Sequence, residues 1–533
     1  MRIPSGRTKL CLAIDKVAFA WAMSAIDPME LALVPCADRI PVGRGDLVET
    51  SQQFVLWLIL TERASLDLFY FKRTAGVVDV CLGLAPDTFI HGVDIFLNGT
   101  LANIDNLTLY HNGKLWLNVE GKTTNNPANN YHFKYVHVKN GGYIHMISDP
   151  VTEPGITFTT TALNIDGGGL VKGTHLYFFS ENITIDGGGI LSADGFGYEL
   201  ADGKGTNNDG SVREGLHGVI NPGLGYTGSI GASGAGHGGS AGRGHGNDLG
   251  GEPYGDIYEP TLFGSAGGGP KGGAGGGRIW LNVTNTIMID GLMTASGDNG
   301  EMEGNSVSYS SDGWVNSKPG GGGSGGSIWL YCQRITGYGT MLAQGGNASK
   351  GAFRNASGSG NTTNYKTTYY GGGGGAGGRI AMYFTQNETF SEFRFLARGG
   401  WPGDEDDDSE SGGPGTIYLY NMAQDHRTLI IDNDGAPYPR EKYVNWDNRM
   451  SDGGRAWILP QSGTSDFANN MYVFQFEELQ IYGNGHLAVL NPGEITVFDA
   501  AVSGQVSNFN VTIDFKYMIG ENGTGTGWAR PSG

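Results

Sequence analysis

The sequence has few cysteines, few basic residues and no long hydrophobic run. Only 4 of its 533 residues are Cys, too few for a chain of this length to be held together by disulfides. Lys and Arg total 34 against 53 Asp and Glu, and the net charge of −19 argues against a nucleic-acid partner, since phosphate binding requires a basic face. The apolar stretch at 54–60 is far shorter than the roughly 20 residues of a membrane-spanning helix, so we assign it to one buried strand or helical turn.

Glycine is the residue that dominates instead, with 93 copies against 20 Pro. This is more than twice the usual share of Gly. Collagen is excluded, because it needs Gly at every third position together with abundant Pro. Hydrophobic residues make up 39% and aromatics 11%, which argues against a disordered chain.

A change in composition near residue 85 divides the chain. The first 85 residues contain 5 Gly, no His and three of the four cysteines, which are Cys11, Cys36 and Cys81. We interpret 1–85 as an N-terminal segment of unrelated composition, expected to be poorly ordered. Its early apolar run is interrupted at Asp15, so no secretory signal is predicted, and we interpret the chain as a fragment or as one with a non-native start. The remainder divides into β-helix coils at 86–200, Gly-rich repeats with long loops at 201–425, and C-terminal coils, expected to be truncated, at 426–533.

Two repeated patterns predict the fold. The first is a short alternating strand that ends in an Asn-Gly corner, as at 94–101, 107–115 and 479–487. The second begins with Gly and continues with alternating apolar residues, and its copies start at the following glycines: Gly277, Gly326, Gly378 and Gly415. The motif Ile-Asp-Gly-Gly-Gly also occurs twice, at Ile165 and Ile185.

Three short strands and three corners in about 20 residues are typical of one coil of a stacked repeat. The sequence therefore predicts an all-β fold, a parallel β-helix solenoid with long Gly-rich loops and a distinct N-terminal segment. The alternative is an antiparallel sandwich or meander, because Asn-Gly between strands also fits a hairpin turn.

The Gly-rich stretches at 228–251, 264–277, 320–326 and 371–378 allow two interpretations. One is flexible linkers. The other is ordered, extended segments of polyproline-II type, packed backbone to backbone where no side chain fits.

The strings GGGRIWL, GGSIWL and GGRIAM, together with GAGHGGSAGRGHG and EPYGDIYEPTLFGSAGGG, carry a resemblance. They resemble Gly-rich β-helical regions of large, mostly uncharacterised extracellular and cell-surface proteins. The resemblance covers roughly residues 90–530. It implies a right-handed, pectin-lyase-like solenoid and an extracellular location, and it brings no catalytic motif.

Candidate catalytic carboxylates are Asp166 and Asp186, whose matching positions place them on adjacent coils. Polysaccharide lyases and hydrolases need such paired carboxylates. Both residues lie in Ile-Asp-Gly corners, where Asp commonly bonds backbone, and Asp194 and Asp290 also precede Gly. We therefore interpret all four as structural corner residues and predict no catalytic site.

Metal ligands are also weakly indicated. The acidic run of Asp404, Asp406 and Asp408 could gather calcium oxygens, but its spacing matches no calcium loop. His237 and His245 have no third ligand at a zinc-like spacing. We predict neither a metal nor a cofactor, and we expect Cys332 to be a small buried hydrophobe.

The sequence contains ten Asn-x-Ser/Thr glycosylation sequons, all after residue 85: Asn98, Asn106, Asn182, Asn282, Asn347, Asn355, Asn361, Asn387, Asn510 and Asn522. Two interpretations remain open. The sequons occur by chance in an Asn-rich chain, or the chain is glycosylated and extracellular.

Two functions follow from these features. The first is a non-catalytic, extracellular structural or adhesive scaffold, whose partners would be extracellular glycans or proteins. The alternative is a carbohydrate-active or carbohydrate-binding β-helix that uses aromatic platforms, for which the candidates are Trp280, Trp329, Tyr331 and Trp401.

Overall fold

The computed structural model describes most of residues 87–118, 130–148, 155–199, 232–303, 315–357, 364–404, 409–437, 454–459 and 472–489, with short gaps, and the backbone of isolated strands outside them. The regular structure of these residues is β-strand, and no α-helix occurs among them. Because these residues form strands and no α-helix, the expected all-β class is confirmed. Most of the strand pairs are parallel.

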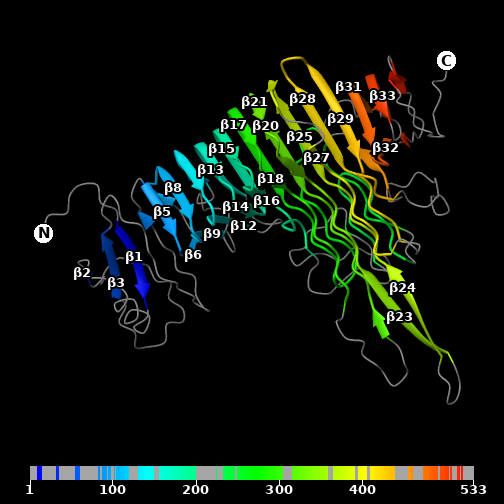
Figure 1. Cartoon of the computed structure of the whole chain (residues 1–533), viewed down its shortest axis with the longest axis horizontal. Helices are drawn as coiled ribbons and strands as arrows, with labels where there is room; N and C mark the ends of the chain where they lie inside the picture. The colour runs from blue at the N-terminus through cyan, green and yellow to red at the C-terminus, as the bar shows by residue number, and fades with distance from the viewer. Residues whose placement is uncertain are drawn as a thin grey trace.

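The largest sheet has 17 strands and extends across most of the molecule (Figure 1). We call it the long sheet. Its strands are β5 (Asp87–His91), β8 (Asn106–Tyr110), β10 (Asn130–His132), β11 (Tyr135–Val138), β13 (Ile156–Ile165), β15 (His175–Ile185), β17 (Arg278–Ile289), β20 (Ser327–Tyr331), β21 (Arg334–Thr336), β25 (Arg379–Phe384), β26 (Gln386–Asn387), β28 (Thr416–Asn421), β29 (His426–Asp432), β31 (Tyr472–Tyr482), β33 (Gly493–Val502), β35 (Ile513–Phe515) and β36 (Met518–Ile519).

A second, eight-stranded sheet receives the strands that follow those of the long sheet along the chain. Its strands are β6 (Asp94–Leu97), β9 (Lys114–Asn118), β12 (Tyr143–Ile147), β14 (Leu170–Gly173), β16 (Ile190–Ser192), β18 (Leu292–Thr294), β22 (Thr340–Leu342) and β27 (Phe395–Leu396). Between β8 and β18 the chain alternates between the two sheets, so each pass adds one row to both.

Four small sheets complete the described strands. They are formed by β1 (Lys9–Ile14), β3 (Phe54–Ile59) and β2 (Ala32–Val34); by β4 (Leu82–Gly83) and β7 (Leu101–Ala102); by β19 (Val315–Ser317), β23 (Lys350–Ser357) and β24 (Asn364–Gly371); and by β30 (Ala456–Ile458), β32 (His486–Val489) and β34 (Gln505–Val506). Most of residues 1–85, expected to be poorly ordered, lie outside the described residues.

The four glycine-led repeats pair with one another in register. Ile279 of β17 pairs with Ile328 of β20, which pairs with Ile380 of β25, which in turn pairs with Ile417 of β28. Alternate residues of these strands point into the interior, where the four isoleucines are at most 1% exposed. The alignment of the repeats is therefore confirmed as parallel strand pairing.

Two details differ from the predicted three-strand coil. The first and middle strands of the copy at Gly277 are continuous in β17, which opposes β15 with a register shift between Ser180 and Asn182. Beyond β28 the chain turns back, so that β28 and β29 pair antiparallel before the parallel pairing resumes with β31.

The Gly-rich segments are extended backbone that is hydrogen-bonded in three directions. In 320–326, the first, fourth and seventh residues donate their N–H to carbonyls of 295–301. The second and fifth donate to 265–268, and the third and sixth donate to 373–376, with all seven bonds between 2.7 and 3.0 Å. A polyproline-II helix has three residues per turn and no internal hydrogen bonds, so a period of three is its signature.

The segment 372–378 repeats this arrangement. Its first, fourth and seventh residues donate to 343–349, its second and fifth to 232–235, and its third and sixth to 410–413. No glycine of 320–326 or 372–378 has a positive φ. These contacts favour ordered segments of polyproline-II type over flexible linkers.

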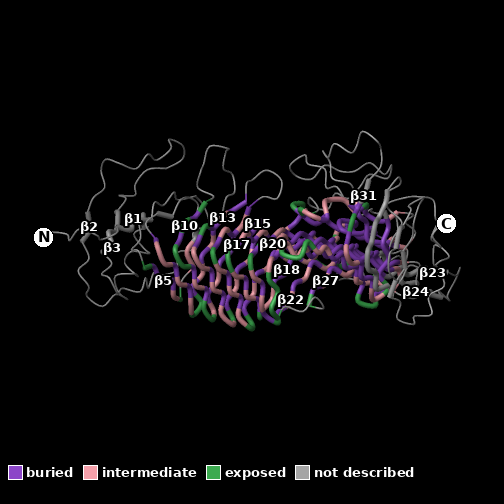
Figure 2. The backbone as a smooth tube through the Cα atoms, turned by 90° about the horizontal axis from the view of Figure 1, so that it is seen from above, coloured by how far each residue is buried: buried purple, intermediate pink, exposed green. Residues whose placement is uncertain are grey.

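We call this assembly the glycine lattice. Its members are residues 232–242, 264–277, 295–301, 320–326, 343–349, 372–378, 397–403 and 410–415. Figure 1 shows them as plain ribbon continuing side by side beyond the strand ends, and Figure 2 shows buried residues continuous through them.

Glycine is required inside the lattice because neighbouring backbones touch. A Cβ on Gly322 would overlap the carbonyl oxygen of Gly346, and one on Gly375 would overlap that of Gly323. These are backbone atoms held by hydrogen bonds, so they cannot move aside as the end of a flexible side chain could.

Candidate functional site

The outer face of the long sheet carries two rows of aromatic side chains between β15 and β28. The first aromatic row follows the strand register through Tyr177, Trp280, Trp329, Ala381 and Tyr418. The second aromatic row lies two residues further along each strand and comprises Phe179, Asn282, Tyr331, Tyr383 and Tyr420. Because side chains alternate across a sheet, both rows face outward.

Rings of the first row stack on one another. The Trp280 and Trp329 rings are 5.0 Å apart between centroids and nearly parallel, at 5°. Tyr177 contacts Trp280 edge to face at 5.4 Å. Trp329 packs on its other side against a buried cluster that includes Ala381 and Tyr418. Stacked aromatic ladders of this kind stabilise parallel strands.

Residues 252–263 form a strap over the start of these strands. The Arg278 guanidinium donates to the carbonyl of Thr261, and the Ser327 hydroxyl donates to that of Leu262. The Tyr383 hydroxyl donates to the carbonyl of Tyr258 at 3.0 Å. Burial raises the pKa of Tyr258 to about 12, so its phenol stays protonated at neutral pH.

Arg379 lies under this strap and is fully buried. Its guanidinium donates to the carbonyl of Tyr254 at 2.8 Å, to that of Trp457 at 3.1 Å and to the Thr416 hydroxyl at 3.0 Å. Burial lowers its pKa to about 10, which still leaves the side chain charged at neutral pH. A buried cation held by neutral acceptors fixes the strap to the sheet and to β30.

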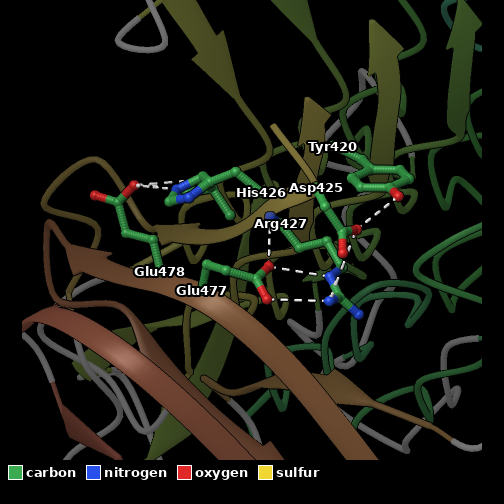
Figure 3. A network of polar contacts seen from close by, with 7 residues as sticks. Tyr420, Asp425, His426, Arg427, Glu477 and Glu478 are labelled. Atoms are coloured by element: carbon green, nitrogen blue, oxygen red, sulfur yellow. Dashed lines mark hydrogen bonds and ion pairs between the residues drawn. The ribbon is translucent and has the colours of Figure 1, made fainter. Parts of the chain in front are cut away.

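A polar network borders the aromatic rows where the sheet reverses direction (Figure 3). Arg427 makes a bidentate contact with Glu477, with two N–O distances of 3.0 Å, and its backbone N–H donates to the same carboxylate at 2.7 Å. Tyr420 donates to Asp425 at 2.8 Å, and this hydrogen bond raises the pKa of the phenol.

The second half of the network faces Glu478. His426 Nε2 lies 3.4 Å from the Glu478 carboxylate, Thr428 donates to it at 3.3 Å, and Gln480 donates to its other oxygen at 2.7 Å. Since Arg427 and His426 are on β29 and both glutamates are on β31, the network joins the reversed strand to the next parallel one.

The aromatic candidates from the sequence do not form one surface. Trp280, Trp329 and Tyr331 lie together on the long sheet, but Trp401 is in the glycine lattice, where its backbone N–H donates to Asn347 Oδ1 at 2.9 Å. A sugar platform needs a free ring face, and each of the two sheet tryptophans presents one face to the other. Tyr331, 45% exposed, is the ring among the four that is most open to solvent.

The corner carboxylates contact neighbouring coils. Asp194 Oδ1 accepts from the Thr294 hydroxyl at 2.5 Å and from the Ser296 N–H at 2.6 Å. Asp290 accepts from the N–H of Tyr338 at 2.9 Å. Asp166 comes directly after Ile165, which pairs across the sheet with Ile185. The Asp166 carboxylate lies 2.7 Å from His137 Nε2 on the preceding coil. The bonds of Asp194 and Asp290 join successive coils rather than closing each residue's own turn.

The candidate metal ligands are dispersed. Asp404 pairs with Lys350 at 2.8 Å, whereas Asp406 and Asp408 lie outside the described residues. His237 is buried, with Nδ1 2.6 Å from the carbonyl of Gly325, while His245 lies against Tyr370. No group of three or more His, Cys, Asp or Glu in the described part of the chain is arranged to bind a metal ion.

The cysteines and sequons are described only in part. Cys332 is buried and forms no disulfide. Burial raises the pKa of its thiol to about 12, so the side chain stays uncharged at neutral pH and packs as a small hydrophobic residue. Cys36 and Cys81 lie outside the described residues, and only the backbone is described at Cys11. Among the sequons, Asn98, Asn361, Asn510 and Asn522 lie outside, and Asn355 has only its backbone described.

Sequence reasoning missed most of the two aromatic rows. The missed members are Tyr177, Phe179, Tyr383, Tyr418 and Tyr420. Aligning the four glycine-led repeats and extending each copy to its sixth residue would have placed three of them, Tyr383, Tyr418 and Tyr420, in two columns. The strap at 252–263 carried no such signal, because nothing repeats it.

No protein-family model, curated protein or solved structure matches this chain. Among the described residues, no helix has the length and hydropathy required to cross a membrane.

Proposed function

We propose that this chain is a non-catalytic structural or adhesive segment of an extracellular or cell-surface protein, built as a parallel β-helix solenoid. The observation that carries the proposal is the glycine lattice, which joins distant segments through backbone hydrogen bonds in three directions. The interior of such a lattice is hydrogen-bonded backbone, which makes it rigid, and rigidity suits a protein whose function is to hold a shape.

The solenoid is supported by the spacing of paired residues. Ile156 pairs with Leu176 in the long sheet, and Leu170 pairs with Ile190 in the second sheet, each 20 residues later. The corners stack as well, since the N–H of Gly141 donates to Gly168 and that of Gly168 donates to Gly188. A chain that returns repeatedly to the same two sheets traces successive coils.

The extracellular location is supported by the ten sequons and by the resemblance of the glycine-led repeats to cell-surface proteins. The partners proposed are extracellular glycans or proteins. The net charge of −19 argues against nucleic acid as a partner.

The experiment is to label the surface of intact cells that express the chain in its native context. An antibody against the chain should stain cells without permeabilisation, and digestion of the sample with an N-glycosidase should lower its apparent mass. Staining that appears only after permeabilisation, with no change in mass, would contradict the extracellular proposal.

A carbohydrate-binding role is the second candidate, favoured by the open ring of Tyr331 beside Tyr383. Binding of the purified chain to immobilised polysaccharides, lost in Tyr331→Ala and retained in Trp401→Ala, would support it over a purely structural role.

A further inference from the structure

We propose that Asn282 carries an N-linked glycan whose first sugars lie on the second aromatic row, with Tyr331 as the main contact. The inference rests on the extracellular part of the proposed function, and it adds which sequon is used and what the sugar does there.

The position of Asn282 in the sheet is the first argument. Asn282 pairs with Phe179 of β15 on one side and with Tyr331 of β20 on the other. Neighbouring strands are about 4.8 Å apart, so both rings flank the amide on the same face. Trp280, two residues earlier on β17, faces the same way and stacks on Trp329.

The second argument is that Asn282 interrupts an otherwise aromatic row. From β15 to β28 the second aromatic row is Phe, Asn, Tyr, Tyr and Tyr, so Asn282 is its single non-aromatic member. The Tyr331 ring on one side of the interruption is 45% exposed. An exposed aromatic ring beside a half-buried polar residue leaves apolar surface for another group to cover.

An N-acetylglucosamine ring fits this surface chemically. A pyranose has one face of C–H groups, which packs on an aromatic face, and hydroxyl edges that remain in water. The sugar is joined to the asparagine amide nitrogen, and the Asn282 side chain makes no hydrogen bond to another described residue. Thr284, which completes the sequon, is exposed.

Two other described sequons, Asn106 and Asn182, differ in having hydrogen-bonded side chains, although Asn106 also pairs with an exposed ring, Tyr135. The Asn106 amide donates to Asp87 at 2.6 Å, and Asn182 Oδ1 accepts from Asn285 at 3.1 Å. The cross-strand neighbours of Asn182 are Ala162 and Thr286, neither of them aromatic. Asn182 is therefore the natural control, since it is a sequon on the same sheet without flanking rings.

The test expresses the full chain behind a secretory signal peptide in eukaryotic cells, so that glycosylation does not depend on the chain's own targeting signal. Glycopeptide mass spectrometry should find Asn282 occupied. Thr284→Ala, which removes the sequon but keeps Asn282, should lower Tm by about 2 °C. In a Tyr331→Ala background the same substitution should leave Tm unchanged, and Thr184→Ala, which removes the Asn182 sequon, should have no dependence on Tyr331.

The outcomes separate this inference from the proposed function. An unoccupied Asn282 with glycans at other sequons would overturn the inference and leave the extracellular proposal standing. Equal Tm losses for Thr284→Ala with and without Tyr331 would also overturn it. Conversely, an occupied, Tyr331-dependent site in this experiment, together with an intracellular native protein, would contradict the extracellular proposal and the native glycan with it, and would leave only the contact between the sugar and Tyr331 standing.

Discussion

The strand stack of residues 155–199 and the glycine lattice stabilise adjacent parts of the molecule in different ways. In the strand stack, alternate side chains such as Phe158, Leu163 and Phe178 fill the space between sheets and are completely buried. In the lattice, backbones such as 320–326 and 372–378 occupy the interior themselves, and their hydrogen bonds run to three neighbours each. One region depends on apolar burial, and the other depends on backbone contact.

The two regions are therefore destabilised by opposite kinds of substitution. A side-chain core is damaged when atoms are removed, because a cavity remains. A backbone lattice is damaged when atoms are added, because no space exists for them. Substitutions of each kind in each region therefore test the comparison.

The largest effect is expected for Gly375→Ala in the lattice. The added methyl group would overlap the carbonyl oxygen of Gly323, so the free energy of unfolding should fall by more than about 4 kcal/mol, or the chain should fail to fold. Gly187→Ala is the matched control, since nothing lies within 4 Å of its added Cβ. It should change stability by less than about 1 kcal/mol in denaturant titration. Similar losses for both variants would refute close packing in the lattice.

A somewhat smaller effect is expected for Leu163→Ala in the strand stack. Leu163 is fully buried, and removing its side chain should cost about 2–5 kcal/mol of unfolding free energy. Thr159→Ala on the solvent side of the same strand should remain within about 0.5 kcal/mol of the parent. A neutral Leu163→Ala would contradict the packed interior between the sheets.

Acid should weaken the lattice through its buried histidine. Burial lowers the pKa of His237 from 6.5 to about 3, so below pH 6.5 the unfolded state takes up a proton that the folded state does not. Stability therefore falls as the pH decreases, by up to about 1.4 kcal/mol per pH unit for this residue.

His237→Asn keeps a donor for the carbonyl of Gly325 and removes the titrating ring. Chemical denaturation between pH 6.5 and 5 should show a shallower pH dependence for this variant than for the parent. An unchanged slope would mean that His237 is not buried in its neutral form.

The smallest effect is expected at the polar network of Figure 3, where the sheet reverses. Arg427→Lys retains the charge but loses the bidentate contact with Glu477. Because the pair is partly exposed, the loss should be about 1 kcal/mol. Combining Arg427→Lys with Glu477→Gln should add little further loss if the two residues act together. Fully additive losses would argue against the contact.

The strand register was predictable because aligning the repeated sequences places the paired residues in the same column. Each glycine-led copy places Ile in the same column, and the structure pairs these residues across four strands. The all-β class also followed from the short apolar alternation, whereas ordered glycine segments were one of two interpretations that the sequence allowed.

The neighbours within the lattice were not predictable, because a run such as GGGGSGG has no side chains to indicate which residue faces which partner. The strap at 252–263 was missed for a related reason: its contacts run through backbone carbonyls, such as that of Tyr254 with Arg379. The antiparallel turn between β28 and β29 interrupts a repeat whose fourth copy otherwise looks like the first three.

Hydrogen exchange tests the central claim, the ordered glycine lattice, most directly. Peptides that cover 320–326 and 372–378 should exchange as slowly as peptides from β15, because their N–H groups are buried and bonded to neighbouring segments. Exchange of these glycine peptides at the rate of an unstructured chain, with β15 still protected, would show that the segments are linkers and would contradict the account.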